Sequence, residues 1–196
     1  MHLDIFMNHK ERIKKVLLSL EGLSIGDSFG QNFFIEQTKA RELIELRTLP
    51  TAPWFYTDDT IMAISIVETL NEFGRIEQDY LARMFAKRYV EQPNRGYGST
   101  AAKTLREIGE EVDWRKASAS AFSGMGSMGN GGAMRAAPIG AYFFDDYEKV
   151  VSEAKASSEV THSHPDAQAG AIAVAIAAAY CVRESLRPIS NHKSLL

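Results

Sequence analysis

The chain has 196 residues, of which 45% are hydrophobic and 24% are charged, and its formal net charge is −3. These values are typical of one globular domain with a substantial core, and the small net charge gives no electrostatic reason to expect a nucleic-acid or membrane partner. The single cysteine, Cys181, excludes an intramolecular disulfide and a cysteine-rich zinc site. Charged residues come too early for a signal peptide, and the longest apolar run, 170–182, is too short to span a bilayer. We therefore expect a cytoplasmic protein.

Apolar residues recur at helical spacing through most of the chain, and no run alternates with a period of two. The sequence therefore predicts an all-α fold. The expected helices cover 12–25, 58–73, 80–90, 99–108, 133–142, 147–160 and 166–184. Pro138 weakens the fifth of them, and a polar tail is expected after the last. The last helix is rich in Ala and Gly, which favours a central buried position because small residues let helices approach closely.

Two adjacent carboxylates lie at the start of the second expected helix, in Thr57-Asp58-Asp59-Thr60. One interpretation is a helix cap, with Asp59 complementing the helix dipole. A cap needs only one oxygen, however, and neighbouring aspartates repel each other unless a cation compensates them. Hydroxyl and carboxylate oxygens together suit a hard cation such as Mg²⁺.

A glycine-rich segment, FSGMGSMGNGGAMR, covers 122–135 and precedes an expected helix. Glycine allows close backbone approach and left-handed conformations, so such a loop can hold an anion. It matches neither the Walker pattern nor the dinucleotide-binding fingerprint, because no strand precedes it. A flexible surface loop is the alternative.

Two shorter motifs complete the set of candidates. In Thr161-His162-Ser163-His164-Pro165-Asp166, the proline suits the first turn of a helix, and the histidines could cap that helix or bind a ligand. In Gly26-Asp27-Ser28-Phe29-Gly30, the Gly-Asp pair is typical of a turn after a helix, yet an aspartate there opposes the helix dipole unless a cation lies near. The lysines and arginines show no pattern beyond a solvated surface.

Taken in order, GLSIGDSFG, YTDDT, RGYGST, GNGGAMRAAPIG and THSHPDA resemble the ADP-ribosylglycohydrolases, which include the dinitrogenase-reductase-activating glycohydrolases, the ADP-ribosylhydrolases and the related J1-crystallins. The resemblance runs from about residue 14 to 180. It implies a multi-helix orthogonal bundle with a site for two Mg²⁺ ions, or Mn²⁺, at the base of a cleft. It also implies hydrolysis of the glycosidic bond between ADP-ribose and an acceptor.

The resemblance assigns roles to particular residues. Thr57, Asp58 and Asp59 would bind metal, the two aspartates would be catalytic, and Asp27 would support the metal site from behind. Phe122 and Met128 would flank the adenine, and Asn130 and His162 would contact the distal ribose. Gly126, Ser127 and Gly129 belong to the part of the loop expected to hold ADP-ribose, with the first two at the diphosphate.

The sequence departs from the family pattern in two places. It lacks the later acidic Asp-x-Asp-Thr motif, so we expect residues 1–196 to form a single incomplete domain without its C-terminal helices. Phe34 stands where many relatives have a glutamate, and Glu36 lies two residues on. The missing C-terminal helices would leave an apolar surface uncovered, and because the helix at 166–182 is rich in Ala, we expect self-association through that surface.

These departures keep other functions open. The chain could be a non-catalytic member that binds ADP-ribose or has a structural role, because half of the expected metal site is absent. An unrelated helical phosphohydrolase with a paired-aspartate site is a third possibility, against which the glycine-rich segment argues. As partners, we expect ADP-ribose-containing small molecules or ADP-ribosylated proteins, with no nucleic acid and no membrane.

Overall fold

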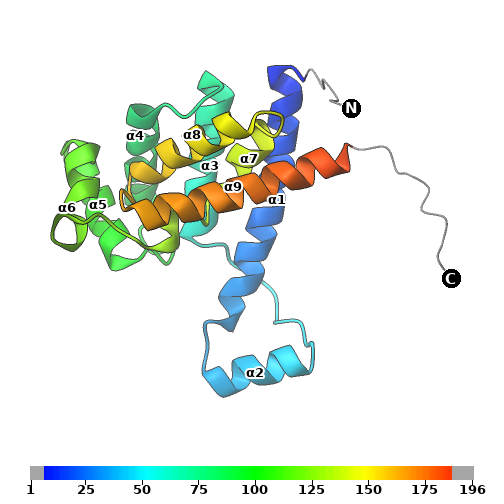
Figure 1. Ribbon diagram of the computed structural model, residues 1–196. Coiled ribbons are helices and arrows are strands. Elements are labelled where there is room, and N and C mark those ends of the chain that lie inside the picture. Colours follow the sequence, from blue (N-terminus) through cyan, green and yellow to red (C-terminus); the bar gives the residue numbers. More distant parts are fainter. Residues whose placement is uncertain (1–6, 187–196) are drawn as a thin grey trace.

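The computed structural model describes residues 7–186, and this range contains nine α-helices, two 3-10 turns and no strand (Figure 1). The all-α prediction is therefore confirmed, while the polar tail expected after the last helix lies outside the described residues. The helices are α1 (His9–Gly30), α2 (Gln37–Glu45), α3 (Asp58–Phe73), α4 (Gln78–Glu91), α5 (Ser99–Gly109), α6 (Trp114–Gly124), α7 (Ala137–Tyr142), α8 (Tyr147–Glu159) and α9 (Pro165–Ser185); the 3-10 turns are η1 (Gln31–Phe33) and η2 (Asn130–Gly132).

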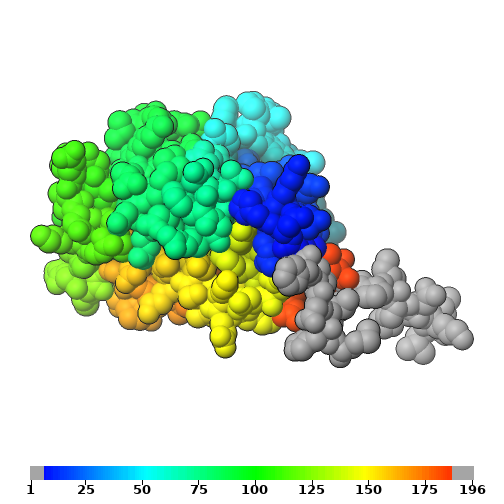
Figure 2. Space-filling view, turned by 90° about the horizontal axis from the view of Figure 1, so that it is seen from above, coloured from blue at the N-terminus to red at the C-terminus, as the bar shows by residue number. Residues whose placement is uncertain are grey.

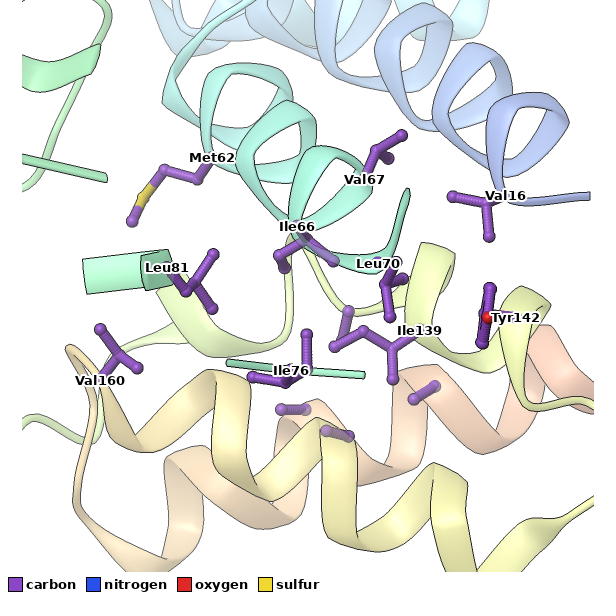
Figure 3. Packing of buried hydrophobic residues seen from close by; sticks show 14 of the residues in the cluster. Val16, Met62, Ile66, Val67, Leu70, Ile76, Leu81, Ile139, Tyr142 and Val160 are labelled. Atoms are coloured by element: carbon purple, nitrogen blue, oxygen red, sulfur yellow. The ribbon is translucent and has the colours of Figure 1, made fainter. Parts of the chain in front are cut away.

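Helix α3 forms at the predicted positions because its ends carry strong local signals. The hydroxyl of Thr57 accepts a hydrogen bond from the backbone of Asp59 at the N-terminus, and Gly74 ends the helix in the left-handed conformation. Ten of the 16 residues of this helix are buried. Figure 3 shows Met62, Ile66 and Leu70 of this helix pointing into the centre of the core. The elements around α3 are therefore arranged about one continuous apolar stripe.

Two helices were not predicted. Helix α2 has only nine residues and none of them is buried. Helix α6, WRKASASAFSG, is built mainly from small and polar residues, although Asp113 caps its first turn by accepting from the backbone of Arg115. The interpretation of Gly26–Gly30 as a turn was wrong, because α1 remains helical through Gly30.

Helices α7 and α9 cross at very close range. An ideal Cβ on Gly140 would lie 1.9 Å from the carbonyl oxygen of Ala175 and 3.0 Å from the backbone nitrogen of Ala179. The side of α9 that faces inward carries only alanine at four-residue spacing, namely Ala167, Ala171, Ala175 and Ala179. The predicted buried position of α9 is confirmed for this face alone, since Val174 and Tyr180 on other faces are exposed.

Helix α9 is also the one helix among residues 7–186 that is long and apolar enough to cross a membrane, judged by length and composition. Core helices of water-soluble proteins pass the same test. Here α9 packs along α7 and α8, which gives its alanine face a protein partner.

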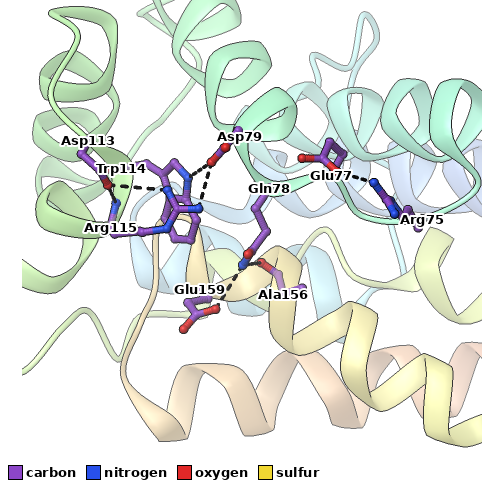
Figure 4. Close-up of polar contacts among 9 residues, drawn as sticks. All are labelled: Arg75, Glu77, Gln78, Asp79, Asp113, Trp114, Arg115, Ala156 and Glu159. Carbon is purple, nitrogen blue, oxygen red and sulfur yellow. Dashed lines mark hydrogen bonds and ion pairs between the residues drawn. The ribbon is translucent and has the colours of Figure 1, made fainter.

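Polar contacts fasten α4 to its neighbours (Figure 4). The indole N–H of Trp114, at the start of α6, donates to Asp79 of α4 at 2.7 Å. The side-chain amide of Gln78 donates at 3.0 Å both to the carbonyl of Ala156 and to Glu159, on α8. In Figure 2, α4 accordingly lies in close contact with α5 and α6 on one side, while α1 begins on the other. These bonds place α6, and thus the loop that follows it, relative to the core.

The far end of α1 and all of α2 lie outside this bundle (Figure 1). Leu18 and Ile25 on α1 are both 64% exposed, and the apolar residues Ile44, Leu46 and Leu49 in and after α2 are more than half exposed. Exposed large apolar side chains on these two consecutive helices make them candidates for an interaction site. We call these five residues the α1–α2 surface.

The close α7–α9 crossing leads to a stability prediction. We expect Gly140→Ala to reduce the free energy of unfolding by about 3 kcal/mol, because its methyl group would overlap backbone atoms of α9 that cannot rotate away. Gly170→Ala, on α9, is the matched control. Its methyl group would meet Ala133 at an ordinary 3.6 Å, so helix propensity should leave stability unchanged or raise it by up to about 1 kcal/mol. Urea unfolding measures both, and equal effects would contradict the predicted close crossing.

Candidate functional site

The carboxylate of Asp27 connects the last turn of α1 to the start of α3. It accepts hydrogen bonds from the backbone and hydroxyl of Thr57, at 2.8 and 2.6 Å, and from the backbone and hydroxyl of Thr60, at 3.2 and 2.6 Å. All four donors lie at the beginning of one helix, where backbone N–H groups lack helical partners. Asp27 thus fixes the start of the helix that carries the acidic pair, and its support of a metal site stays a prediction.

The acidic pair carries more negative charge than its surroundings compensate. Asp58 is 9% exposed and Asp59 is partly buried. Burial, followed by repulsion from Asp59, raises the pKa of Asp58 to about 6. The pKa of Asp59 is raised as well, first by burial and then by Asp27. Carboxylates in this state gain from a bound cation.

The hydroxyl and carboxylate oxygens at the start of α3 are the kind of ligand that a hard cation prefers, but they are few. Among residues 7–186, no three His, Cys, Asp or Glu side chains gather as a metal cluster. Mg²⁺, however, is usually held by one or two carboxylates, with water and phosphate oxygens completing its shell. The hydroxyl of Tyr97 is buried without a hydrogen-bond partner in the described part of the chain, and its pKa is raised by burial and by Asp58. An orphaned hydroxyl near the acidic pair fits a site that is completed by a further oxygen-bearing group.

The glycine-rich segment forms a loop with several left-handed residues. Phe122, Ser123, Gly124 and Gly126 all have positive φ angles, from 51° to 93°. Gly126 also approaches the following motif, since a Cβ there would lie 2.3 Å from the hydroxyl oxygen of Ser163 and 2.8 Å from the backbone nitrogen of His164. The chain thus brings the glycine-rich loop and the histidine motif into direct contact, and only glycine fits at this point.

Side chains of the loop differ in exposure. Phe122 and Met128 are 49% and 50% exposed, which leaves both available to flank a flat group. Ser127 is buried, and its hydroxyl accepts a hydrogen bond from the backbone of Gly129 at 3.3 Å. Asn130 begins η2, directly before two buried glycines. The assignment of these residues to ADP-ribose stays a prediction.

His162 lies beneath this loop. Its ring packs against Gly131, where an ideal Cβ would be 2.3 Å from the Cε1 atom. The imidazole is 4% exposed. Burial, together with the nearby positive charge of Arg135, lowers the pKa of His162 to about 3. The imidazole is therefore neutral at physiological pH.

Arg135 is the functional candidate that sequence reasoning missed, because it was placed with the solvated basic residues. It is completely buried, and its guanidinium lies 4.3 Å from the centre of the Phe85 ring. Burial lowers its pKa to about 9, against an opposing effect of Asp58. Arg135 affects the pKa of both His162 and Asp58, so its charge links the loop side of the site to the acidic pair. The apolar residues on both sides of Arg135 in AMRAA were the signal for its burial.

The region around Phe34 offers no replacement for the expected glutamate. Phe34 is 84% exposed. The carboxylate of Glu36 caps α2, accepting from the backbone nitrogens of Thr38 and Lys39 and from the hydroxyl of Thr38. A separate hollow of about 620 Å³ is lined by Arg12, Tyr142, Asp145, Lys149 and Arg183, among others, and by none of the predicted site residues.

Comparison with known proteins gives concordant matches. The family described as ADP-ribosylglycohydrolase matches residues 8–194. "ADP-ribosylhydrolase ARH3" of Gallus gallus is 36% identical over 124 residues, which is 62% of this chain and 34% of the relative. The Homo sapiens protein of the same description is 33% identical over 129 residues, 65% of this chain and 35% of the relative. An uncharacterized protein of Archaeoglobus fulgidus is 29% identical over 206 residues, a match that covers 95% of this chain and 64% of the relative. The chain thus spans about a third of these two ARH3 relatives.

The charge imbalance at the acidic pair predicts a gain in stability when Asp58 is neutralised. Because its pKa is raised to about 6 in the folded protein, the folded state binds more protons than the unfolded state between about pH 4 and 6, and stability falls as the pH rises through that window. Without divalent cations, we expect Asp58→Asn to melt about 3 °C above the native chain at pH 7, with the difference shrinking towards pH 5.

Glu72→Gln is the matched control, because Glu72 is an exposed acid at the other end of α3. Thermal unfolding at several pH values measures both variants. An Asp58→Asn variant that melts at or below the native temperature at pH 7 would contradict the assigned charge imbalance.

Proposed function

Because the chain belongs to the ADP-ribosylglycohydrolase family, which matches residues 8–194, we propose that it hydrolyses the glycosidic bond between ADP-ribose and an acceptor in a Mg²⁺-dependent manner. The acceptor belongs to an ADP-ribosylated protein or to a small ADP-ribose conjugate. The observation that carries the proposal is the packing of the glycine-rich loop on the His162 motif, with Arg135 between that motif and the acidic pair.

The loop is suited to the ADP-ribose part of the substrate. Gly126 and Ser127 would hold the diphosphate: the N–H of Gly126 donates to the carbonyl of Ala121 at 3.0 Å, so the backbone N–H of Ser127 would face the phosphates. The exposed Phe122 and Met128 would hold the adenine. Backbone turns with left-handed residues bind phosphate groups in this way. Asn130 and His162 would hydrogen-bond the distal ribose, which places its reacting carbon towards the acidic side of the site.

The acidic pair is suited to the reaction itself. Thr57, Asp58 and Asp59 would hold Mg²⁺, with Mn²⁺ as an alternative, and the bound ions would supply positive charge that orients oxygen ligands and stabilises developing negative charge. One carboxylate of the pair would take the proton from the attacking water or give one to the leaving group.

A second function has support in the same structure. Among residues 7–186, no three His, Cys, Asp or Glu side chains gather as a metal cluster, so the proposed metal site has only the two carboxylates of the acidic pair. Glu36 is engaged as a helix cap. These observations favour a non-catalytic member that binds ADP-ribose or has a structural role. Turnover dependent on a divalent metal distinguishes the two functions, because only the enzyme releases the acceptor from an ADP-ribosylated substrate.

A thermal-shift titration with ADP-ribose, with and without Mg²⁺, tests the proposal. A ligand that binds only the folded state raises the melting temperature by mass action, by an amount equivalent to about 2.7 kcal/mol at 100 times the dissociation constant. We expect a shift that Mg²⁺ increases. Asp58→Ala should remove the Mg²⁺-dependent part, whereas Glu72→Ala should retain it. A Mg²⁺ response that is unchanged in Asp58→Ala would refute the metal assignment.

We also propose that the chain self-associates through the α1–α2 surface. Leu18 and Ile25 are exposed, and no other part of the described chain covers them. A partner that covered them would remove apolar area from water. Sedimentation of the native chain should therefore show a dimer or larger species, and Leu18→Lys with Ile25→Lys should shift it to monomer. Val112→Lys, which alters an exposed apolar residue elsewhere, is the control. A native chain that sediments as a monomer with a cooperative melt rejects this proposal.

A further inference from the structure

A chain of hydrogen bonds leads from the buried Arg135 to the imidazole of His162. The guanidinium Nη2 donates to the hydroxyl oxygen of Thr161 at 2.8 Å and to the carbonyl of Ser157 at 3.0 Å. The same Thr161 oxygen lies 2.8 Å from Nδ1 of His162. Arg135, Thr161 and His162 are 0%, 1% and 4% exposed, so no bulk water competes for these bonds.

The chemistry of the three groups fixes the direction of each bond. A guanidinium can only donate, so Thr161 accepts from Arg135 and keeps its own proton free to donate. The one acceptor that the described residues place at its oxygen is Nδ1 of His162. If Nδ1 carried a proton instead, the Thr161 hydroxyl would accept two bonds and leave its own buried proton without a partner, which is the more costly arrangement.

The other ring nitrogen of His162 faces the glycine-rich loop. Nε2 lies 2.7 Å from the ideal Cβ position of Gly131 and 3.5 Å from that of Gly129. These two residues have no side chain, so the ring edge occupies the space beside the loop backbone. No hydrogen-bond partner of Nε2 occurs among residues 7–186. Nε2 is not one of the side-chain atoms in this range that are buried without a hydrogen-bond partner. It is therefore accessible to a ligand.

We infer that Arg135 and Thr161 are positioning residues that hold His162 as a neutral imidazole with its proton on Nε2, so that Nε2–H is a directed donor to an oxygen atom of a ligand in the glycine-rich loop. The lowered pKa of His162 agrees with this, because burial and the nearby Arg135 charge both oppose a second proton on the ring. The direction of the donor follows from the geometry of Thr161. The nature of the ligand oxygen, a ribose hydroxyl or a phosphate, rests on the proposed function.

The tautomer can be measured without any ligand. Two-bond ¹H–¹⁵N correlation spectra at pH 7 distinguish a protonated Nε2 with a bare Nδ1 from the opposite tautomer and from the imidazolium. His162→Asn assigns the signals by their loss. We expect the native chain to show protonated Nε2 alone. A protonated Nδ1, or a ring protonated on both nitrogens, would overturn the inference.

Two variants of Thr161 test the origin of the preference. Thr161→Ser keeps the hydroxyl, so the Nε2–H tautomer should persist. Thr161→Val keeps the shape and removes the hydroxyl, so a mixture with the Nδ1–H tautomer should appear. A pure Nε2–H signal in Thr161→Val would show that Thr161 does not set the tautomer. If Thr161→Val fails to fold, the native spectrum still decides whether Nε2 carries the proton, and Thr161→Ala removes the hydroxyl with a smaller side chain.

Binding of ADP-ribose tests what the donor does. Thr161→Val should weaken binding by the factor by which the Nε2–H population falls in its spectrum, and Thr161→Ser should bind within about twofold of the native chain. Equal affinity of all three proteins would overturn the donor role. If the native chain shows the expected tautomer but does not bind ADP-ribose, the proposed function fails while the inferred proton arrangement stands.

Discussion

The bonds of Asp27 to Thr57 and Thr60 are the interaction on which the rest of the site depends. Residues about thirty positions apart in sequence meet here, and one carboxylate satisfies four donors at the start of α3. The position of Asp58 and Asp59 is therefore set by where α1 ends as well as by the helix that carries them. An aspartate in the last turn of α1 opposes the dipole of its own helix. The donors at the start of α3 offset that cost, because their positive end faces the same carboxylate.

The ionisable groups of the site are buried where water cannot stabilise their charged forms. The pKa values of Asp58 and Asp59 are raised by burial, and those of Arg135 and His162 are lowered by it. Each shift means that the folded protein disfavours the charged form relative to water. The packing of α3, α7 and α8 holds these groups in place nonetheless. Such unfavourable electrostatics are concentrated at functional sites, where a ligand or ion supplies the missing compensation.

Most of the fold could be predicted from the sequence because its core helices carry apolar residues at regular spacing. Helix α3 shows this best, since a threonine cap, an apolar stripe and a terminal glycine agree on the same bounds. Helix α2 was not predicted, because its nine residues are too few to show a repeated pattern and none of them is buried. Helix α6 escaped because its small and polar residues carry a weak pattern, and its four buried residues face neighbours that the sequence does not identify.

Some residues of the candidate site could likewise be predicted from the sequence, and others could not. The acidic pair and the glycine-rich loop are contiguous motifs, so their residue types could be read directly. The role of Arg135 could not, because an arginine is usually solvated and its partners Phe85, Ser157 and Thr161 come from other parts of the chain. The hydrogen-bonding state of His162 depends on those same tertiary contacts. Contiguous sequence patterns therefore indicate candidate site residues, whereas the contacts of Arg135 come from tertiary packing that such patterns do not encode.

The position of Asp27 connects the exposed apolar surface to the site. Asp27 lies two residues after Ile25, in the part of α1 that extends beyond the bundle towards α2. The start of α3 is thus held by a helix segment with little packing of its own on its outer face, and segments of this kind open at lower free energy than the core. Any partner that covers the α1–α2 surface stabilises the last turns of α1, and through Asp27 it stabilises the placement of the acidic pair. We therefore expect ligand binding at the site and burial of this surface to favour each other, because each would favour the same ordered end of α1.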